Sequence, residues 1–495
     1  MNKKSIVIIG GGPAGMMAAI RAGQLGQNVT LIEKNPSLGR KLLLTGKCRC
    51  NLTNACDIET LLGKFNKNGR FLRTALNTFS NTDLMQFFEG RGLPLKIERQ
   101  LRVFPITDLS NSVLEILKKE LDVSNVRIVY NAQIEDILVQ DNQVRGVVLR
   151  EEVSSRQVGA GSKPALSEAG DKRQSVGAGS KPALSEAGDK RQSVGAGSKP
   201  ALSEAGDKRQ KQGIVQGLTE QVNPNSVISC DRIILATGGI SYGFTGSTGE
   251  GLKIAQRLGH RIVPLRAGLV PLRIKGHYPK LLEGLTLKNI QLVFKCGKRQ
   301  IVSEVGELLF TDFGISGPLI LSLSGQIVDW LNNEGKTVFV TIDLKPGMSE
   351  EQLNARFLRE FSDNSKKSIR SILKFFLPQR MVDVFMEIAG ILQDKQVNQI
   401  NKDERHRLVA LFKGLQLEVI GALPVEQAMI TQGGISLKDI NPQTMESCIV
   451  SGLYFAGEIM DVDADTGGFN LQASFSTGYL AGENAAISVG EQLLR

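Results

Sequence analysis

Residues 3–34 read KKSIVIIGGGPAGMMAAIRAGQLGQNVTLIEK: an apolar run, a glycine turn, a stretch of small residues and a second apolar run that ends in an acid. This order is typical of the strand–helix–strand unit that binds a dinucleotide. Gly10 permits the tight turn after the first strand, Gly12 lets the backbone approach a pyrophosphate, and Gly15 lets the helix pack closely on the strand. The helix N-terminus then stabilises the phosphates with unpaired N–H groups.

The residues after this glycine turn extend the predicted site. Glu33 stands eighteen residues past Gly15 and is expected to accept hydrogen bonds from a ribose diol. Arg40 and Lys41 follow in the next loop, where they can approach ribose and phosphates, although a solvated surface pair is the alternative. The strand before the glycine turn, the helix after it and the acid at position 33 all fit a dinucleotide-binding unit. An ordinary glycine turn is therefore the weaker interpretation.

Composition bounds the class of protein. The chain has 495 residues, 41% of them hydrophobic and 22% charged, which suits a soluble protein of two or three domains. No apolar run approaches the ~18 residues of a membrane span, and glycines interrupt the apolar start, so we predict a cytoplasmic protein without a targeting segment or membrane partner. The net charge of +10 is spread along the chain, so nucleic acid is an unexpected partner. The sequence indicates no oligomeric state.

Residues 157–210 are three nearly identical 18-residue copies of (S/Q)VGAGSKPALSEAGDKRQ. Each copy holds one Val and one Leu as its only large apolar residues, so it lacks the apolar surface that would offset the entropy of ordering. We predict a disordered loop inserted at the tip of a β-hairpin, with a partner-binding segment as the alternative.

Two later segments favour a flavin dinucleotide. VISCDRIILATGGI (227–240) predicts a buried strand that runs into a second glycine turn, and residues 449–486 predict a strand, a turn at Gly457 and Glu458, and a final helix of small residues. A nicotinamide site needs neither segment, whereas the longer FAD needs polar backbone beyond the first strand–helix–strand unit. We therefore predict FAD in a discontinuous domain, with the final helix stabilising negative charge on the reduced ring.

The predicted cofactor site combines these segments. Its expected cofactor-binding residues are Gly10, Gly12, Pro13, Ala14, Gly15, Glu33, Lys34, Arg40, Lys41, Asn51, Ala236, Thr237, Gly238, Gly457, Glu458, Gly468, Asn470 and Leu471. The three clustered cysteines Cys48, Cys50 and Cys56 lack a matching CxxC or HxxxH partner, so no metal site is predicted.

The predicted fold class is α/β: a Rossmann-like, discontinuous FAD-binding domain with an inserted β-rich subdomain and a small helical subdomain. The expected parts are residues 1–261 for the first piece of the FAD-binding domain, 262–348 for the β-rich subdomain, 349–413 for the helical subdomain, 414–430 for a return strand, and 431–495 for the C-terminal piece of the FAD-binding domain. The insertion is expected to shape the substrate pocket.

Seven ordered motifs carry a resemblance to a known family: GRKLLLTGKCRCNLTN (39–54), RVFP (102–105), ATGGISY (236–242), TGSTGEG (245–251), GELLFTDFGISGP (306–318), TQGGISLKDINPQTMES (431–447) and GLYFAGEIMDVDADTGGFNLQ (452–472). The chain resembles the BaiN-like, or aminoacetone-oxidase-like, bacterial flavoproteins. The resemblance implies the same three-part architecture and FAD, but no single substrate, because family labels range from amine oxidation to reduction of conjugated steroid ketones. Gly243 replaces a common proline, and Lys47 and Cys48 replace glycines before Arg49.

The sequence thus predicts an FAD-dependent oxidoreductase that transfers a hydride to or from a small organic substrate. No second strand–GxGxxG–helix unit is present, so an NAD(P)H donor would visit the flavin face directly. The catalytic residues are not identified, and the pocket candidates are Arg49, Arg102, Tyr242 and Asp465. A flavin-dependent RNA-modifying protein and a flavin-binding module without turnover are the alternatives.

Overall fold

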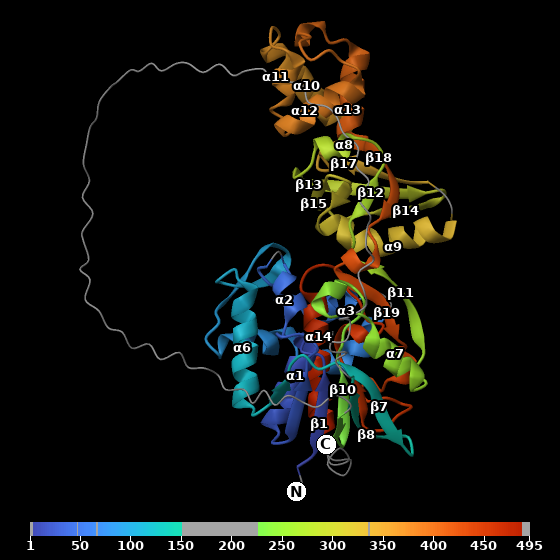
Figure 1. The fold of residues 1–495 in the computed structure, drawn as a ribbon. Helices are drawn as coiled ribbons and strands as arrows, with labels where there is room; N and C mark the ends of the chain where they lie inside the picture. The colour runs from blue at the N-terminus through green and yellow to red at the C-terminus, as the bar shows by residue number, and fades with distance from the viewer. Residues whose placement is uncertain (1–2, 47, 66–67, 151–225, 335–336, 488–495) are drawn as a thin grey trace, which may run out of the picture. The chain divides into compact units, whose positions relative to one another are not determined.

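The computed structural model describes residues 3–46, 48–65, 68–150, 226–334 and 337–487 (Figure 1). The repeat predicted to be disordered, residues 157–210, lies outside the described residues, so that prediction stays untested.

A parallel sheet with the strand order β20-β10-β1-β2-β6 forms the centre of the nucleotide-binding domain. Its strands are β1 (Ser5–Ile9), β2 (Asn28–Ile32), β6 (Arg127–Val129), β10 (Arg232–Leu235) and β20 (Leu453–Phe455). Strands far apart in sequence are thus neighbours, which confirms the predicted discontinuous Rossmann-like domain. Ile6, Ile8, Ile233 and Ile234 are fully buried, as parallel strands covered on both faces require.

Two helices of small residues pack beside this sheet, α1 (Pro13–Gln24) and α14 (Phe469–Ala486). A methyl group on Gly478 would lie 2.2 Å from the carbonyl oxygen of Ala14, and one on Gly482 would lie 2.4 Å from that of Ala18. Contacts that advance by four residues on both helices mean that the helices run parallel. Their N-termini therefore lie at the same end.

The remaining elements of this domain surround the sheet. They are α2 (Arg40–Leu44), β3 (Thr53–Asn54), α3 (Ile58–Gly63), α4 (Arg73–Thr78), α5 (Asn81–Glu89), β4 (Leu95–Ile97), β5 (Arg102–Pro105), α6 (Ser110–Val123), β7 (Ile134–Gln140), β8 (Gln143–Leu149), β9 (Val227–Ser229) and α7 (Glu250–Arg257). A two-stranded antiparallel ribbon, β11 (Ile262–Gly268) with β19 (Ile430–Ile435), begins and ends the inserted segment.

The first part of the insertion is a closed antiparallel barrel. Its strands are β12 (Leu272–Ile274), β13 (Thr286–Cys296), β14 (Arg299–Val302), β15 (Gly306–Thr311), β16 (Gly314–Ser316), β17 (Val338–Asp343) and β18 (Leu415–Ala422), with α8 (Tyr278–Leu281) and α9 (Pro318–Glu334) between them. The sheet order β14-β13-β15-β16-β12-β18-β17 closes because β13 also pairs with β17. Closure gives every strand of this sheet at least two neighbours except β14, which pairs with β13 alone among the described strands.

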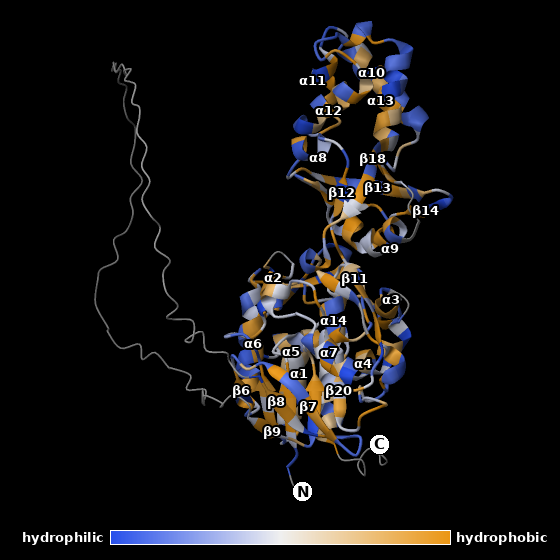
Figure 2. Ribbon diagram, turned by 45° about the vertical axis from the view of Figure 1, so that its right-hand side comes forward, coloured by the Kyte–Doolittle hydropathy of each residue, from blue (hydrophilic) through white to orange (hydrophobic). Residues whose placement is uncertain are grey.

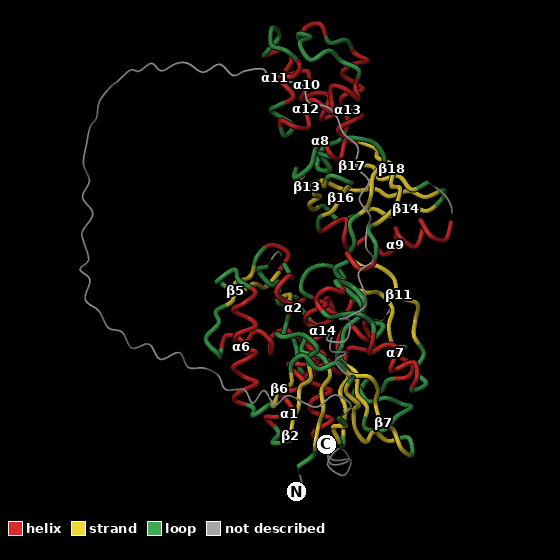
Figure 3. Tube along the Cα trace, in the orientation of Figure 1, coloured by secondary structure: helices red, strands yellow, loops and turns green. Residues whose placement is uncertain are grey.

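The second part is helical and consists of α10 (Glu350–Asp363), α11 (Ile369–Leu373), α12 (Gln379–Ala389) and α13 (Lys402–Gly414). Figure 3 shows these helices and the barrel strands as separate groups. Phe357, Phe385 and Phe412 are fully buried in one apolar cluster that also contains the barrel residues Phe294 and Phe310. The predicted order of a β-rich and then a helical insert is confirmed, while the exact domain boundaries stay predictions.

Helix α9 departs from the expected β-rich character of residues 262–348, in which the sequence offered only strand-like runs. It starts at Pro318, directly after Gly317 with a φ of +98°. Proline is favoured in the first helical turn because its missing N–H group has no partner there in any case.

Among the described residues, no helix is long and apolar enough to cross a membrane. The cytoplasmic location stays a prediction.

Deletion of residues 157–210 is expected to leave FAD content and melting temperature nearly unchanged. Strands β8 and β9 on either side of the repeat pair with each other, with Gly146 opposite Ser229 and Val148 opposite Val227, so the shortened connection still joins adjacent ends. Loop length changes the closure free energy by only about 0.6 kcal/mol per doubling. Absorbance and thermal unfolding of the shortened protein measure this, and loss of folding would show that the repeat packs on the protein.

Candidate functional site

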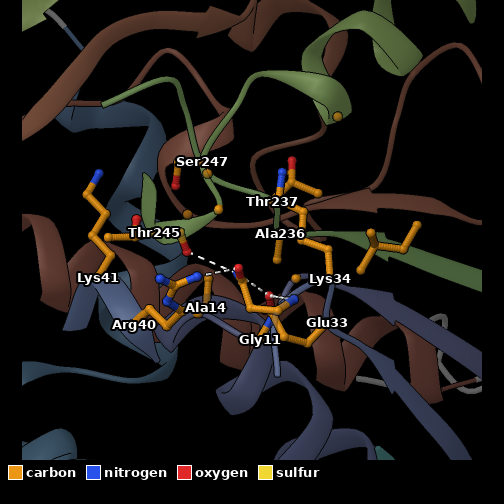
Figure 4. A pocket seen from close by; sticks show the side chains of 18 of the residues that line it. Gly11, Ala14, Glu33, Lys34, Arg40, Lys41, Ala236, Thr237, Thr245 and Ser247 are labelled. Atoms are coloured by element: carbon orange, nitrogen blue, oxygen red, sulfur yellow. Dashed lines mark hydrogen bonds between the residues drawn. The ribbon is translucent and has the colours of Figure 1, made fainter. Parts of the chain in front are cut away.

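One cavity opens where neighbouring parallel strands end. Gly10 follows β1, Glu33 follows β2, Ala236 follows β10, and Gly457 lies two residues after the end of β20. All four residues line the cavity, and Figure 4 shows Glu33 and Ala236 among its lining side chains. The cavity holds about 1010 Å³ of empty space, solvent at its mouth included. Open α/β sheets bind ligands at this carboxyl edge.

The structure brings most of the predicted cofactor residues together here. The predicted residues that line this cavity are Gly10, Gly12, Pro13, Ala14, Glu33, Lys34, Arg40, Lys41, Ala236, Thr237, Gly238, Gly457 and Glu458. Asn470 and Leu471 line a second cavity instead, and Gly15, Asn51 and Gly468 line neither of the two. Their roles toward a cofactor stay predictions.

The three glycines of the first turn serve different purposes. A methyl group on Gly10, whose φ is +105°, would lie 2.5 Å from the Ala236 carbonyl oxygen, and one on Gly15 would lie 1.9 Å from the Gly10 carbonyl oxygen. The fold itself requires these two glycines. A methyl group on Gly12 would meet nothing within 4 Å, so the space before Gly12 is available to a ligand.

The polar groups around this space suit a pyrophosphate. Helix α1 begins after Gly12 with Pro13 at its first position, and neither an acidic residue in its first turn nor a side-chain cap competes for its N–H groups. The buried Oγ1 of Thr237 has no hydrogen-bond partner among the described residues. Unpaired donors at a helix N-terminus are the usual means of binding phosphate.

Glu33, which is predicted to bind a ribose, is held in place by hydrogen bonds. Its buried carboxylate accepts hydrogen bonds from the backbone N–H groups of Gly11 (2.8 Å) and Asn35 (2.9 Å), and from the Asn35 side-chain amide (2.6 Å). Arg40 donates to the Asn35 side-chain oxygen at 2.6 Å. Arg40 thus supports Glu33 through Asn35, a role that the sequence pattern did not suggest.

Glu458 links three segments at the cavity wall. Its carboxylate accepts hydrogen bonds from the Ser241 hydroxyl (2.9 Å) and the Thr431 backbone N–H (2.7 Å), and pairs with the Lys41 ammonium at 2.6 Å. It therefore joins the loop after β10, strand β19 and helix α2. Lys41 also donates to Ser241 at 2.7 Å, so its charge is held at this wall.

A second cavity, with about 680 Å³ of empty space, continues the first. The two cavities share Pro13, Lys41, Leu42, Gly457, Glu458 and Ser474. The side-chain oxygen of Asn470 accepts from the Ala464 N–H, and its amide donates to the Ala464 carbonyl, both at 2.9 Å. The N-terminal turn of α14 thus borders the second cavity, as α1 borders the first, and the shared wall makes one elongated site for a long, two-part ligand.

Asn51 lies beside the start of α14. With its amide oriented to satisfy both neighbours, Asn51 donates to the Thr53 carbonyl (3.2 Å) and accepts from the Gly468 N–H (3.1 Å). It therefore supports the turn before α14 without lining either cavity.

A glycine-rich loop at residues 245–251 is a part of the site that the sequence argument missed. All seven residues from Thr245 to Gly251 line the first cavity, and the last two of them begin α7. Gly246 and Gly249 have φ values of +116° and +77°. The sequence showed these glycines, but without a preceding strand they gave no reason to expect a contribution to this cavity.

None of the four pocket candidates, Arg49, Arg102, Tyr242 and Asp465, lines either cavity. Arg49 pairs with Glu98 and donates to Asp108 at 2.8 Å, and its guanidinium stacks over Phe104 at 4.3 Å. Tyr242 packs edge-on against Phe244, and partial burial raises the pKa of its hydroxyl.

The charges of Arg102 and Asp465 have fewer close partners of opposite charge than the charge of Arg49 has. Burial lowers the pKa of Arg102, whose guanidinium makes no hydrogen bond or close ion pair with any residue in the described ranges. Burial also raises the pKa of Asp465, whose nearest cation, the Lys64 ammonium, is 4.0 Å away.

The two residues lie on connected segments. Arg102 pairs with Asn54 between β5 and β3, and the Asn54 amide donates to the Gly467 carbonyl at 3.3 Å, two residues past Asp465. The backbone carbonyl of Asp465 in turn accepts from Asn470, which lines the second cavity.

The parallel sheet, its two convergent helix N-termini and the elongated site define a dinucleotide-binding flavoprotein. Two family models match the chain: HI0933-like protein Rossmann domain over residues 4–174, and HI0933-like protein barrel and H2TH domain over residues 266–430. The chain belongs to the HI0933-like family, and the resemblance noted from the sequence motifs is confirmed.

Similar proteins span nearly the whole chain. The 3-dehydro-bile acid delta(4,6)-reductase of Clostridium scindens is 27% identical over 489 residues, covering 98% of this chain and 99% of that protein. The ribosomal RNA dihydrouridine synthase of Haemophilus influenzae is 28% identical over 492 residues, covering 98% of each chain. Among solved structures, a 3-ketosteroid delta1-dehydrogenase from Sterolibacterium denitrificans aligns with a TM-score of 0.47 at 11% identity, covering 98% of this chain and 100% of that one.

The protein is an FAD-dependent oxidoreductase, as predicted. The glycine turn and Glu33 suit the nucleotide half of FAD, and the cavity beside α14 suits its ring. Within the described ranges, no three His, Cys, Asp or Glu residues gather to hold a metal ion.

Proposed function

We propose that this enzyme reduces a carbon–carbon double bond conjugated to a carbonyl group. The observation that carries the proposal is the pair of relatives that align over 98% of the chain. A 3-dehydro-bile acid with 4,6 double bonds is a conjugated ketone, and the C5–C6 double bond of uridine is conjugated to a carbonyl. The two names therefore share one reaction on different substrates.

This reaction makes definite demands on the protein. FAD, when bound, supplies the hydride for the β carbon. The chain must polarise the substrate carbonyl and deliver a proton to the α carbon, so that the double bond becomes a single bond. A half-buried cation without a close counter-ion suits the first task and a half-buried carboxyl with a raised pKa suits the second, which favours Arg102 and Asp465.

NADH or NADPH is the proposed donor, and it would reach the flavin from solution. Anaerobic incubation of the purified holoprotein with each nucleotide and with cyclohexenone or a 3-oxo-4,6-diene steroid tests the reaction. The expected result is oxidation of the nucleotide and a product that has gained two hydrogens, measured by mass spectrometry. Flavin that the nucleotide reduces but that no conjugated carbonyl reoxidises would refute the proposal.

Asp465→Asn is expected to slow substrate reduction by roughly 10²–10⁴-fold, the usual contribution of a positioned acid. Because the carboxyl donates its proton only when protonated, the native rate should fall as pH rises through the raised pKa of Asp465, and the variant should lose this dependence. A pH profile of substrate reduction measures both effects.

Asp461→Asn is the matched control. Asp461 lies in the same loop, and burial raises its pKa as well, but its carboxylate accepts from Asn68 at 3.3 Å. Equal pH profiles for both variants would exclude Asp465 as the specific proton source.

A uridine base within RNA is the second candidate substrate. The name of the Haemophilus relative favours it. Detection of dihydrouridine in an RNA incubated with the holoprotein and nucleotide distinguishes it from a small free substrate.

A further inference from the structure

One segment of the helical subdomain is strongly basic. Residues 364–382 contain Lys366, Lys367, Arg370, Lys374 and Arg380, and no acidic residue. Helix α11 lies within this segment. In Figure 2 much of the α10–α13 region is coloured as hydrophilic.

Three of the five basic side chains have no acidic or carbonyl partner to compensate their charge among the described residues. Arg370 pairs with Asp383 at 2.9 Å, and Arg380 donates to the Glu283 carbonyl at 2.7 Å. Lys366, Lys367 and Lys374 are exposed and form no ion pair with any residue that the structure describes. Their charges remain available to a partner.

An exposed aromatic ring lies among these lysines. Phe375 is 61% exposed although its neighbour Phe376 is buried in the core of the subdomain. The Lys367 ammonium lies over the Phe375 ring, 6.0 Å from its centre. A large exposed ring costs hydration free energy, so its place beside three lysines suggests a ligand that combines negative charge with flat rings.

Further positive charge lies near this aromatic pair. The Arg356 guanidinium stacks over Phe376 at 4.9 Å. Burial, and then the charge of Arg356, lower the pKa of Lys345. Arg356, on helix α10, thus adds one positive charge from outside helix α11.

We propose that Lys366, Lys367, Lys374 and Phe375, here called the basic face, bind RNA. The lysines neutralise backbone phosphates and the Phe375 ring stacks on an unpaired base. The proposal rests on the second candidate substrate above, because the relative named for a ribosomal RNA aligns over 98% of this chain. It revises the expectation that nucleic acid is an unexpected partner: that expectation used whole-chain averages, whereas these four residues lie together in one short stretch of the sequence, 366–375.

Binding of a fluorescein-labelled RNA stem–loop with uridines in its loop, measured by anisotropy over a series of salt concentrations, tests the proposal on the full-length holoprotein. Replacing Lys366, Lys367 and Lys374 together by alanine is expected to weaken binding at least tenfold and to reduce the log–log salt slope by about 2 to 3, since each phosphate contact contributes about 0.7 to 0.9. Phe375→Ala is expected to weaken binding roughly tenfold with little change in slope.

The matched control replaces Lys288, Lys295 and Lys298 by alanine. These exposed lysines lie on and just beyond β13 of the barrel, and their loss changes the net charge equally. An equal loss of RNA affinity in both triple variants would overturn the proposal. The proposal would also fail if the basic-face variant bound RNA with the native dependence of affinity on salt concentration. So would absence of RNA binding in the native protein, or basic-face-dependent binding to anionic phosphatidylserine vesicles in place of RNA.

Reduction of cyclohexenone by the same variants separates this proposal from the proposed function. The basic-face variants should reduce it at the native rate, because the changed residues lie outside both cavities. RNA binding that persists when no conjugated carbonyl is reduced would refute the reaction and leave the RNA surface standing.

Discussion

Replacement of Gly12 by leucine is expected to give a folded protein without FAD. The backbone of Gly12 has φ −79° and ψ −179°, which any residue adopts, and its missing Cβ faces open space in the cavity. We therefore expect a leucine side chain to clash only with the pyrophosphate that is predicted to lie there. Flavin absorbance per chain should fall to background, while circular dichroism retains the native helix and strand content.

Gly15→Ala and Gly63→Leu make this result specific. The methyl group at position 15 would lie 1.9 Å from the Gly10 carbonyl, so α1 must move off the sheet, and we expect loss of folded yield at a cost of about 1–3 kcal/mol or more. Gly63 is exposed and a side chain there meets nothing within 4 Å, so its leucine variant should keep FAD. Full FAD content in the Gly12 variant would mean that the pyrophosphate lies elsewhere.

Asn470→Asp is expected to lower the two-electron potential of the flavin by several tens of millivolts. Asn470 lies in the first turn of α14, where N–H groups and the helix dipole would stabilise the anionic reduced ring, and a carboxylate there opposes that charge. Each 1.4 kcal/mol lost from the reduced form corresponds to about 30 mV. A spectroelectrochemical titration measures the shift, and FAD content should stay unchanged.

Two variants separate charge from structure at this position. Asn470→Ser removes the hydrogen bonds to Ala464 without adding charge. It should therefore lower the melting temperature and leave the flavin potential nearly unchanged. Asn484→Asp places the same charge near the opposite end of α14 and should leave the potential unchanged. An unchanged potential in Asn470→Asp, with FAD bound, would place the ring away from this helix.

The sequence predicted the central fold well because each signal was local. The Gly10–Gly15 turn, the buried strands and the spaced Glu33 each follow from short-range chemistry, and a parallel sheet then brings the strand ends together. Helix α9 was missed because its run of Leu and Ile from Leu319 fits a buried strand as well as a buried helix. Only its place against the barrel decides between them.

The site was harder to predict where it depends on contacts between distant segments. Asn35 gave no sequence signal, although it connects Arg40 to Glu33. The basic Arg49 looked suited to a substrate, but two carboxylates, 49 and 59 residues away, hold it in a separate network. Such pairings depend on tertiary geometry, which spacing along the chain does not reveal.

The late position of β20 in the chain has a consequence during synthesis on the ribosome. Strand β10 must wait for β20, more than two hundred residues later, to cover its outer edge, and α14 follows later still. One edge of the apolar strand Arg232–Leu235 therefore stays without a partner while the barrel and helical insert emerge and fold. FAD finds its complete site only after β20 and α14 have been made, so rapid folding of the insert shortens the time during which the open strand edge can pair with another chain.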